Sequence, residues 1–335
     1  MRILITTGIY PPKVGGPSQY AKNLFEVWQK AGHEVLVRTY TIENSIPTGI
    51  RHIWFFLKII PAVLKSDFVL SLDTYSVGFP SVFASKIFGK KVMIRTGGDF
   101  LWESYVERTR ERVLFRNFYE DKAVKLNLKE KVIFSITKWT LKNANKLIFS
   151  TNWQRDIFVK AYQLDIEKTS IIENYYGQKE SSLGPNSKDF IASTRNLYWK
   201  NLDVLKKIFV RIVRKNSQVK LYTLNTDYDS FMERMRGSFA VVLVSLGDIS
   251  PNMILDAIRL NKPFICTKEV GIFDRIKDAG IFVDPLNENE IEEAVLKLLN
   301  PEEYSKAKEK VKNFNFTHTW EEICNEFITI YNSIE

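Results

Sequence analysis

Short runs of β-branched and aromatic residues alternate with amphipathic stretches of helical length along nearly the whole chain, and this alternation constrains the fold most. In the first half the predicted strands are residues 2–6, 34–40, 68–72, 91–95, 146–150 and 169–173. In the second half they are residues 190–194, 219–223, 240–245, 263–267 and 280–284. Strands separated by helices are joined by right-handed crossovers, so the sequence predicts an α/β protein with parallel sheets.

A polar segment, YYGQKESSLGPNSKD at 175–189, interrupts the alternation and is typical of a linker. We therefore predict two Rossmann-like, doubly wound domains that face a cleft. The first domain covers residues 1–178, and the second covers residues 179–314. The last segment, 315–335, is expected to form an amphipathic helix that packs back on the first domain. Open sheets of this kind bind ligands at the carboxyl ends of their strands.

Positive charge is concentrated in the first half of the chain. Residues 1–180 hold 27 Lys and Arg against 17 Asp and Glu, whereas the remaining residues hold 21 against 22. Such an excess attracts a phosphorylated molecule, an anionic membrane surface or nucleic acid, although it also serves solubility alone. Because no known nucleic-acid-binding module is present, we expect no nucleic-acid partner.

Metal and membrane-span signals are weak in this sequence. The two cysteines, Cys266 and Cys324, form no spaced ligand set, and the three histidines are scattered. We therefore expect no metal site and no histidine-based triad. No apolar run reaches the length of a membrane span, and the N-terminus has no cleavage site, which favours a cytoplasmic protein. The very apolar segment 52–65 is expected to be a buried helix with a proline kink.

Two short motifs place anion-binding groups after predicted strands. Gly15 and Gly16 follow the first strand, where flexible backbone can bring N–H groups and a helix start to an anion. In TRNLYWKNLD, Arg195 follows a strand and Lys200 precedes a helix. A planar guanidinium and a compact ammonium placed in this way suit a diphosphate, whereas each motif alone is also compatible with a structural turn or a solvated basic pair.

Several segments resemble the retaining glycosyltransferases of the GT-B superfamily, in particular family 4 (glycosyltransferase group 1). These segments, in chain order, are ILITTGIYPPKVGGPSQYAKNLFE, RTGGDFLWE (95–103), SIIENYYG (170–177), STRNLYWKNLDVL (193–205) and VSLGDISPNMILDAIRLNKPFICT (244–267). The resemblance implies an enzyme that moves a sugar from a nucleotide diphosphate sugar, of UDP or GDP type, with retention of configuration. It implies neither a cofactor nor a metal.

The resemblance also assigns roles to individual residues. It implies that Arg195 and Lys200 hold the diphosphate, that Asp256 binds the ribose, and that Asp248 and Asp99 contact the transferred sugar. Other donor contacts are expected from Gly15, Gly16 and the backbone of Ile249, Ser250, Pro251 and Asn252.

Two features depart from the family pattern. Asp248 and Asp256 stand where the family usually has two glutamates, and each carboxylate is about 1.5 Å shorter in reach. Between residues 225 and 240 there is room for only one short helix, so the second domain is abridged and the nucleobase preference cannot be carried over.

A basic and aromatic segment in the first half is a candidate acceptor or membrane patch. Its cations are Arg108, Arg110, Arg112 and Arg116. In the resembled family the first domain receives the acceptor, so we expect a glycan or a lipid-linked acceptor and an anionic membrane at the cytoplasmic face. The alternative is a solvated helix whose charges pair as Glu107–Arg110, Arg108–Glu111 and Arg116–Glu120.

Two other functions remain open at this point. A sugar-nucleotide 2-epimerase of the same fold would need acid and base side chains near the anomeric carbon, and the scarcity of histidine there counts against it. A non-catalytic, degenerate GT-B protein that binds a glycan or a membrane surface is compatible with the two aspartates and the shortened second domain.

Overall fold

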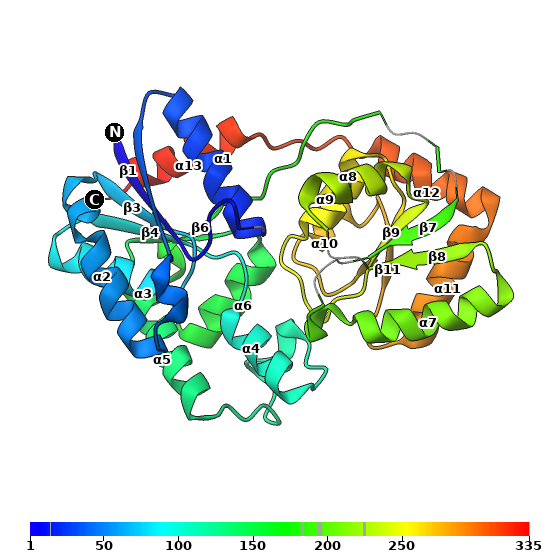
Figure 1. Ribbon diagram of the computed structural model, residues 1–335, viewed down its shortest axis with the longest axis horizontal. Coiled ribbons are helices and arrows are strands. Elements are labelled where there is room, and N and C mark those ends of the chain that lie inside the picture. The colour runs from blue at the N-terminus through cyan, green and yellow to red at the C-terminus, as the bar shows by residue number, and fades with distance from the viewer. Residues whose placement is uncertain (14, 182–183, 186, 193–195, 224–225, 335) are drawn as a thin grey trace. The chain divides into compact units, whose positions relative to one another are not determined.

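The computed structural model describes all residues except 14, 182–183, 186, 193–195, 224–225 and 335, and it divides into two compact units (Figure 1). Unit 1 consists of Met1–Leu101, Lys122–Tyr175 and His318–Glu335, and unit 2 consists of Trp102–Asp121 and Tyr176–Thr317. The last segment of the chain is thus grouped with unit 1. Residues 102–121 are grouped with unit 2, whereas the sequence analysis placed them in the first domain.

Unit 1 contains a sheet of six parallel strands in the order β2-β1-β3-β4-β5-β6. The strands are β1 (Arg2–Thr7), β2 (Glu34–Thr39), β3 (Phe68–Ser71), β4 (Lys91–Arg95), β5 (Lys146–Phe149) and β6 (Thr169–Ile171). The central strands β3 and β4 are buried along almost their whole length, which explains the apolar runs Phe68–Leu70 and Val92–Ile94 within them. The strand order reverses between β1 and β3.

Helices cover both faces of this sheet (Figure 1). Ile3 and Ile5 of β1 share a core cluster with residues of α1 (Gly16–Lys30) and α13 (Trp320–Asn332). Because side chains alternate along a strand, Leu4 points to the other face. The helices on that side are α2 (Thr48–Lys65), α3 (Gly78–Ile87) and α5 (Leu128–Asn143). The remaining elements of the unit include α6 (Asn152–Tyr162), η1 (Ile42–Ser45) and η3 (Ile166–Lys168).

Helix α2 corrects one expectation of the sequence analysis. It forms a helix with Pro61 inside, as predicted, but it is not a buried helix. Phe55 and Ile59 are fully buried, whereas Ile53 is 63% exposed and Trp54 is 47% exposed. The helix therefore buries one apolar face and exposes another. Among the described residues, no helix is both long enough and apolar enough to cross a membrane.

Unit 2 contains a sheet of five parallel strands in the order β11-β10-β9-β7-β8. The strands are β7 (Lys188–Ile191), β8 (Val219–Tyr222), β9 (Ala240–Leu243), β10 (Phe264–Thr267) and β11 (Ile281–Val283). The helices are α7 (Leu202–Lys215), α8 (Tyr228–Gly237), α9 (Asn252–Arg259), α10 (Phe273–Ile276), α11 (Glu288–Leu299) and α12 (Pro301–Asn313). Helix α4 (Phe100–Thr109) begins in unit 1 and continues in unit 2.

The predicted α/β class with two parallel sheets is confirmed. Each of the eleven segments predicted as a strand overlaps one of the strands β1 to β11, although β7 begins two residues before the predicted segment 190–194. The single short helix expected between residues 225 and 240 is α8. Unit 2 has two core clusters. In the first, residues of β7, β9 and β10 pack with α7 and α11. In the second, residues of the same strands pack with α9.

Candidate anion-binding site at the carboxyl edge of the second sheet

The strand order of unit 2 defines where a ligand site is expected. Strand β7 lies between β8 and β9, so the chain leaves β7 toward β8 and later returns to the other side of β7 as β9. In open α/β sheets the crevice outside the carboxyl ends of two such strands is the usual binding site. Lys200 closes η4 (Tyr198–Lys200) after β7, and Asp248 follows β9. The topology therefore brings both predicted residues to this edge.

Lys200 and Asp248 form a nearly buried ion pair. The Nζ atom of Lys200 donates to Oδ2 of Asp248 at 2.6 Å, and the side chains are only 9% and 14% exposed. The same ammonium lies 4.1 Å from the ring centroid of Trp199, a cation–π contact. A cation and an anion are thus fixed next to each other at the switch point of the sheet.

Backbone hydrogen bonds hold Asp248 in place. Its N–H donates to the carbonyl of Glu269 at 2.9 Å, and its carbonyl accepts from Gly271 N–H at 2.9 Å. Asp248 therefore forms an isolated parallel bridge with Val270. Since the backbone is fixed on both sides, the orientation of the carboxylate depends on few free torsions.

Residues 102–121 contact all three loops that follow β7, β9 and β10. The contacts run from Tyr198 N–H to Glu107 Oε1 (2.6 Å), from Phe115 N–H to the Leu246 carbonyl (3.2 Å) and from Arg116 Nε to Glu269 Oε2 (2.6 Å). These bonds explain why this segment is grouped with unit 2. Burial raises the pKa of Glu269, and the guanidinium of Arg116 opposes that effect.

Gly247 allows this segment to pack against the loop after β9. A Cβ atom at Gly247 would lie 2.5 Å from Cβ of Phe115 and 3.2 Å from the Trp102 ring. Trp102 in turn packs on Trp199, with ring centroids 5.6 Å apart. A glycine is therefore required directly before Asp248 for the aromatic side chains to approach.

Asp256, the other predicted acidic residue of unit 2, lies on α9. Its Oδ1 atom is 3.1 Å from Arg259 Nη2 and accepts from Tyr228 Oη at 3.3 Å. Burial raises the pKa of Asp256 to about 6 although Arg259 lies so close. Before the helix, Ile249 is buried, Pro251 is the N-cap residue without a side-chain cap, and Asn252 is the first helical residue.

The predicted residues of unit 1 lie at the carboxyl ends of its strands. Gly15 is the N-cap of α1, after β1, and Gly16 is the first residue of that helix. Gly15 has φ of 156°, and a Cβ atom there would lie 2.9 Å from the Ile9 side chain, so this position favours glycine. Asp99 follows β4 and is buried.

Asp73, which was not among the predicted site residues, lies after β3 at the switch point of unit 1. Its carboxylate accepts N–H bonds from Tyr75 (2.9 Å), Val77 (3.1 Å) and Gly78 (3.0 Å). Burial raises its pKa, and these backbone donors oppose the effect. Its position directly after the predicted strand 68–72 was the available signal. The contacts indicate that it shapes the turn into α3.

The other predicted residues have mixed outcomes. Arg195 lies outside the described residues. Arg110 pairs with Glu107 at 3.2 Å, as the alternative interpretation expected, whereas Arg116 pairs with Glu269. The described residues contain no group of three or more His, Cys, Asp or Glu side chains that could hold a metal ion.

Solved structures with a similar fold include a sucrose-phosphate synthase and several glycosyltransferases. Sucrose-phosphate synthase from Thermosynechococcus elongatus aligns with 99% of this chain and 98% of its own, with 12% identity and a TM-score of 0.71. WaaG, a glycosyltransferase involved in lipopolysaccharide biosynthesis, aligns with 99% of this chain and 100% of its own, with 14% identity and a TM-score of 0.70.

Anabaena HepE in complex with UDP-glucose aligns with 100% of this chain and 98% of its own, with 14% identity and a TM-score of 0.64. No protein-family model and no curated protein matches the sequence. At this level of identity the comparison establishes the fold, and it confirms the predicted GT-B glycosyltransferase fold for this chain.

Proposed function

We propose that this protein is a metal-independent, retaining glycosyltransferase. It transfers a sugar from a UDP-type or GDP-type donor to a glycan or lipid-linked acceptor. It acts in the cytoplasm, at the inner face of the membrane. The observation that carries this proposal is the Lys200–Asp248 pair outside the carboxyl ends of β7 and β9. Similarity to structures solved with UDP or UDP-glucose supports it.

In this proposal Lys200 and Arg195 bind the diphosphate. When the bond between the anomeric carbon and the phosphate oxygen breaks, negative charge grows on the leaving phosphate. Cations that are already in position stabilise this charge at no cost of reorganisation. The Lys200 ammonium has donors besides the one bonded to Asp248, so it can bind a phosphate oxygen and keep its partner.

Asp248 then has a second carboxylate oxygen for a hydroxyl of the transferred sugar. Asp99, which is buried after β4, is proposed to contact the same sugar. Retention requires that the acceptor attacks from the face that the phosphate leaves. The acceptor hydroxyl transfers its proton to the leaving phosphate, and its oxygen forms the new bond to the anomeric carbon.

The remaining roles follow the same donor orientation. Gly15 and Gly16 approach the phosphates, as does the backbone of residues 249–252 before α9. Asp256 binds the ribose; both of its contacts above use Oδ1, so Oδ2 can accept a ribose hydroxyl. Arg108 and Arg112, whose residues are exposed, are proposed to contact a phosphate on the acceptor.

A second candidate is a non-catalytic GT-B protein that binds a glycan or a membrane surface. The favouring observation is that Asp248 and Asp256, the two shortened acidic residues, already pair with cations of the same unit. Such a protein would bind a nucleotide weakly or not at all, and it would not turn over a donor.

Donor turnover separates the two candidates. We would incubate the protein with a panel of UDP-sugars and GDP-sugars, measure nucleoside diphosphate release, and determine the anomeric configuration of the product by NMR. We expect release from one donor class, with at least about a hundredfold loss in Lys200→Met and in Arg195→Ala. Lys206→Met, on the exposed side of α7, is the matched control and should keep full activity.

Absence of release from every donor, with the protein folded, would favour the non-catalytic candidate. An inverted product would contradict the retaining mechanism but not the transferase function. Arg195→Ala guards against an indirect effect in Lys200→Met, because the latter leaves a buried carboxylate without its cation.

A further inference from the structure

Exposed apolar side chains gather on one side of unit 1. The α2–α3 face, as we name it, consists of Ile50, Ile53, Trp54, Leu57, Leu64, Phe83 and Ile87. The first five lie on α2 at helical spacing, opposite the residues that α2 buries. In the described part of unit 2, by contrast, the exposed large apolar residues are Val210, Val213, Tyr228 and Leu286.

Ring contacts join this face to the neighbouring helices. Phe56 of α2 lies 5.4 Å from Phe83 of α3, and Phe83 lies 6.1 Å from Trp139 of α5, measured between ring centroids. In Figure 1 the three helices lie on the same side of the sheet. The apolar residues and the charged residues of these helices therefore belong to one surface layer.

The charges of this layer are almost all positive. Helices α2, α3 and α5 are described in full, and they contain eight basic residues and one acidic residue, Glu130. Glu130 is buried in the capping box that starts α5, so it contributes no exposed acid. The basic residues are Arg51, Lys58, Lys65, Lys86, Lys129, Lys131, Lys138 and Lys142.

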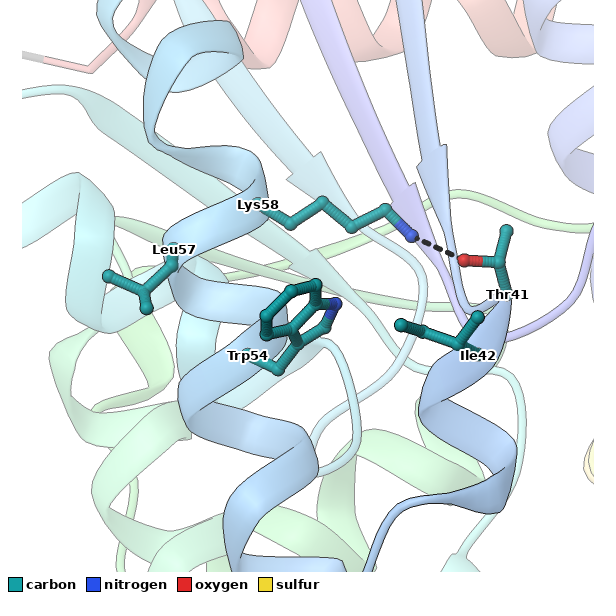
Figure 2. A pocket seen from close by; sticks show the side chains of 5 residues that line it. All are labelled: Thr41, Ile42, Trp54, Leu57 and Lys58. Carbon is teal, nitrogen blue, oxygen red and sulfur yellow. Dashed lines mark hydrogen bonds between the residues drawn. The ribbon is translucent and has the colours of Figure 1, made fainter.

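An apolar groove of about 360 Å³ opens beside the same face (Figure 2). Trp54 and Leu57 of α2 line one side of it, and Thr41 and Ile42 line the other. Lys58 lies at this groove, but its ammonium already donates to the Thr39 carbonyl (2.8 Å), Thr41 Oγ1 (3.0 Å) and Glu43 Oε1 (2.7 Å).

An ammonium group has three N–H donors, so these three acceptors occupy all the hydrogen-bond donors of Lys58. The groove is therefore not built to bind an anion. Its remaining walls are an indole ring and aliphatic side chains, which suit a hydrocarbon chain.

We propose that the α2–α3 face docks on an anionic lipid bilayer, with the groove open to an acyl chain. Apolar side chains with an indole ring enter the interface, and lysines around them attract anionic headgroups. This inference names a surface for the membrane location in the proposed function, but its test needs no donor sugar. A second copy of the chain fits less well, because a symmetric dimer would bring two strongly basic layers together.

The arginine segment of unit 2 is the rival membrane surface. Two of its cations, Arg110 and Arg116, are paired with Glu107 and Glu269. Lys58 of α2 is likewise paired with Glu43. The helices α2, α3 and α5 themselves carry no exposed acid, however, so their remaining charge is better suited to an anionic surface.

Vesicle flotation tests the proposal. The full-length protein would be mixed with phosphatidylglycerol vesicles or with phosphatidylcholine vesicles and then separated on a density gradient. Two variants remove the docking features: Ile53→Ser/Trp54→Ser/Leu57→Ser and Lys129→Glu/Lys131→Glu. Each has a matched control on the exposed side of α7, namely Val210→Ser/Val213→Ser and Lys206→Glu/Lys207→Glu.

We expect the wild-type protein to float with phosphatidylglycerol vesicles and only weakly with phosphatidylcholine vesicles. Each docking variant should bind at least about tenfold more weakly, and each control should bind as the wild type does. Circular dichroism and thermal unfolding would verify that every variant folds. Because all substituted residues are exposed, unfolding is not expected.

Three results would overturn the proposal. The first is a wild-type protein that does not float with anionic vesicles. The second is a loss of flotation in Arg108→Glu/Arg112→Glu while both docking variants still float. The third is a dimer in light scattering that the serine variant converts to a monomer, since a second copy would then cover the face. Nucleotide binding and donor turnover, measured without lipid, would show independently whether the proposed function fails.

Discussion

Replacing Asp248 with alanine leaves the buried ammonium of Lys200 without its carboxylate. The two side chains are 9% and 14% exposed and their polar atoms are 2.6 Å apart, so water screens the pair only weakly. Removing one partner of a buried ion pair typically costs about 3–5 kcal/mol of unfolding free energy. The Trp199 ring, 4.1 Å away, offsets about 1 kcal/mol of that cost. We therefore expect Asp248→Ala to destabilise unit 2 by about 2–4 kcal/mol.

A double-mutant cycle in urea measures this interaction directly. The cycle consists of Asp248→Ala, Lys200→Met and the combination of both, followed by near-UV circular dichroism. Because the combined variant buries no uncompensated charge, it should be within about 1 kcal/mol of the wild type, with a coupling energy of at least about 1.5 kcal/mol. Glu26→Ala, which breaks the exposed Lys22–Glu26 pair, is the control and should cost less than about 0.5 kcal/mol.

An Asp248→Ala variant that loses no more stability than Glu26→Ala would refute this expectation. The same would be true if the destabilisations by Asp248→Ala and Lys200→Met simply added in the double variant. Either result would mean that solvent, and not Asp248, compensates the charge of Lys200.

Two further substitutions test the surroundings of this pair. Gly247→Ala should lower the unfolding free energy by about 1–3 kcal/mol, because its Cβ would lie 2.5 Å from Cβ of Phe115. Gly237→Ala, with open space around its Cβ, is the control and should be tolerated. Urea unfolding of both variants measures the difference. Asp256→Asn tests pH dependence. The pKa of Asp256 is about 6 in the folded protein against an ordinary 3.8, so the folded protein binds this proton more tightly than the unfolded chain does. The stabilisation from the protonated carboxyl group is therefore fully present below about pH 4, and it is lost as the pH rises to about 6. The difference in unfolding free energy between wild type and Asp256→Asn should therefore fall over that range and stay constant above it, and a pH-independent difference would contradict the burial argument.

The strands and the sheet class could be predicted because central parallel strands are buried on both faces. Segments such as 68–72 and 240–245 are short and apolar apart from one serine each, and a buried strand suits them between amphipathic helices. These features depend on local sequence and on the alternation of short apolar segments with amphipathic helices.

Long-range packing could not be predicted from the same patterns. The grouping of residues 102–121 with unit 2 depends on Trp102 and Phe115 approaching Gly247, more than a hundred positions away. The pairing of Lys200 with Asp248 was likewise invisible, because each residue alone suggested a contact with the ligand. Both contacts join residues that are far apart in the sequence, and no local sequence pattern indicates that such residues are close in space.

Helix α2 shows the limit of hydrophobicity as a signal. Its segment 52–65 is very apolar, with Lys58 and Lys65 as its only charged residues, and this pattern predicts a buried helix. The sequence alone does not separate a fully buried helix from one that buries a single apolar face. Only the exposed positions of Ile53 and Leu57 distinguish the two.

The central claim is that the site at Lys200 and Asp248 binds the diphosphate of a nucleotide sugar. Isothermal titration of UDP and GDP into the wild type, Arg195→Ala, Lys200→Met and the Lys206→Met control tests it most directly. The account predicts that one nucleotide binds the wild type and the control equally, and that Arg195→Ala and Lys200→Met bind it at least about tenfold more weakly. Wild-type protein that binds neither nucleotide, or binding that both variants retain in full, would contradict the account.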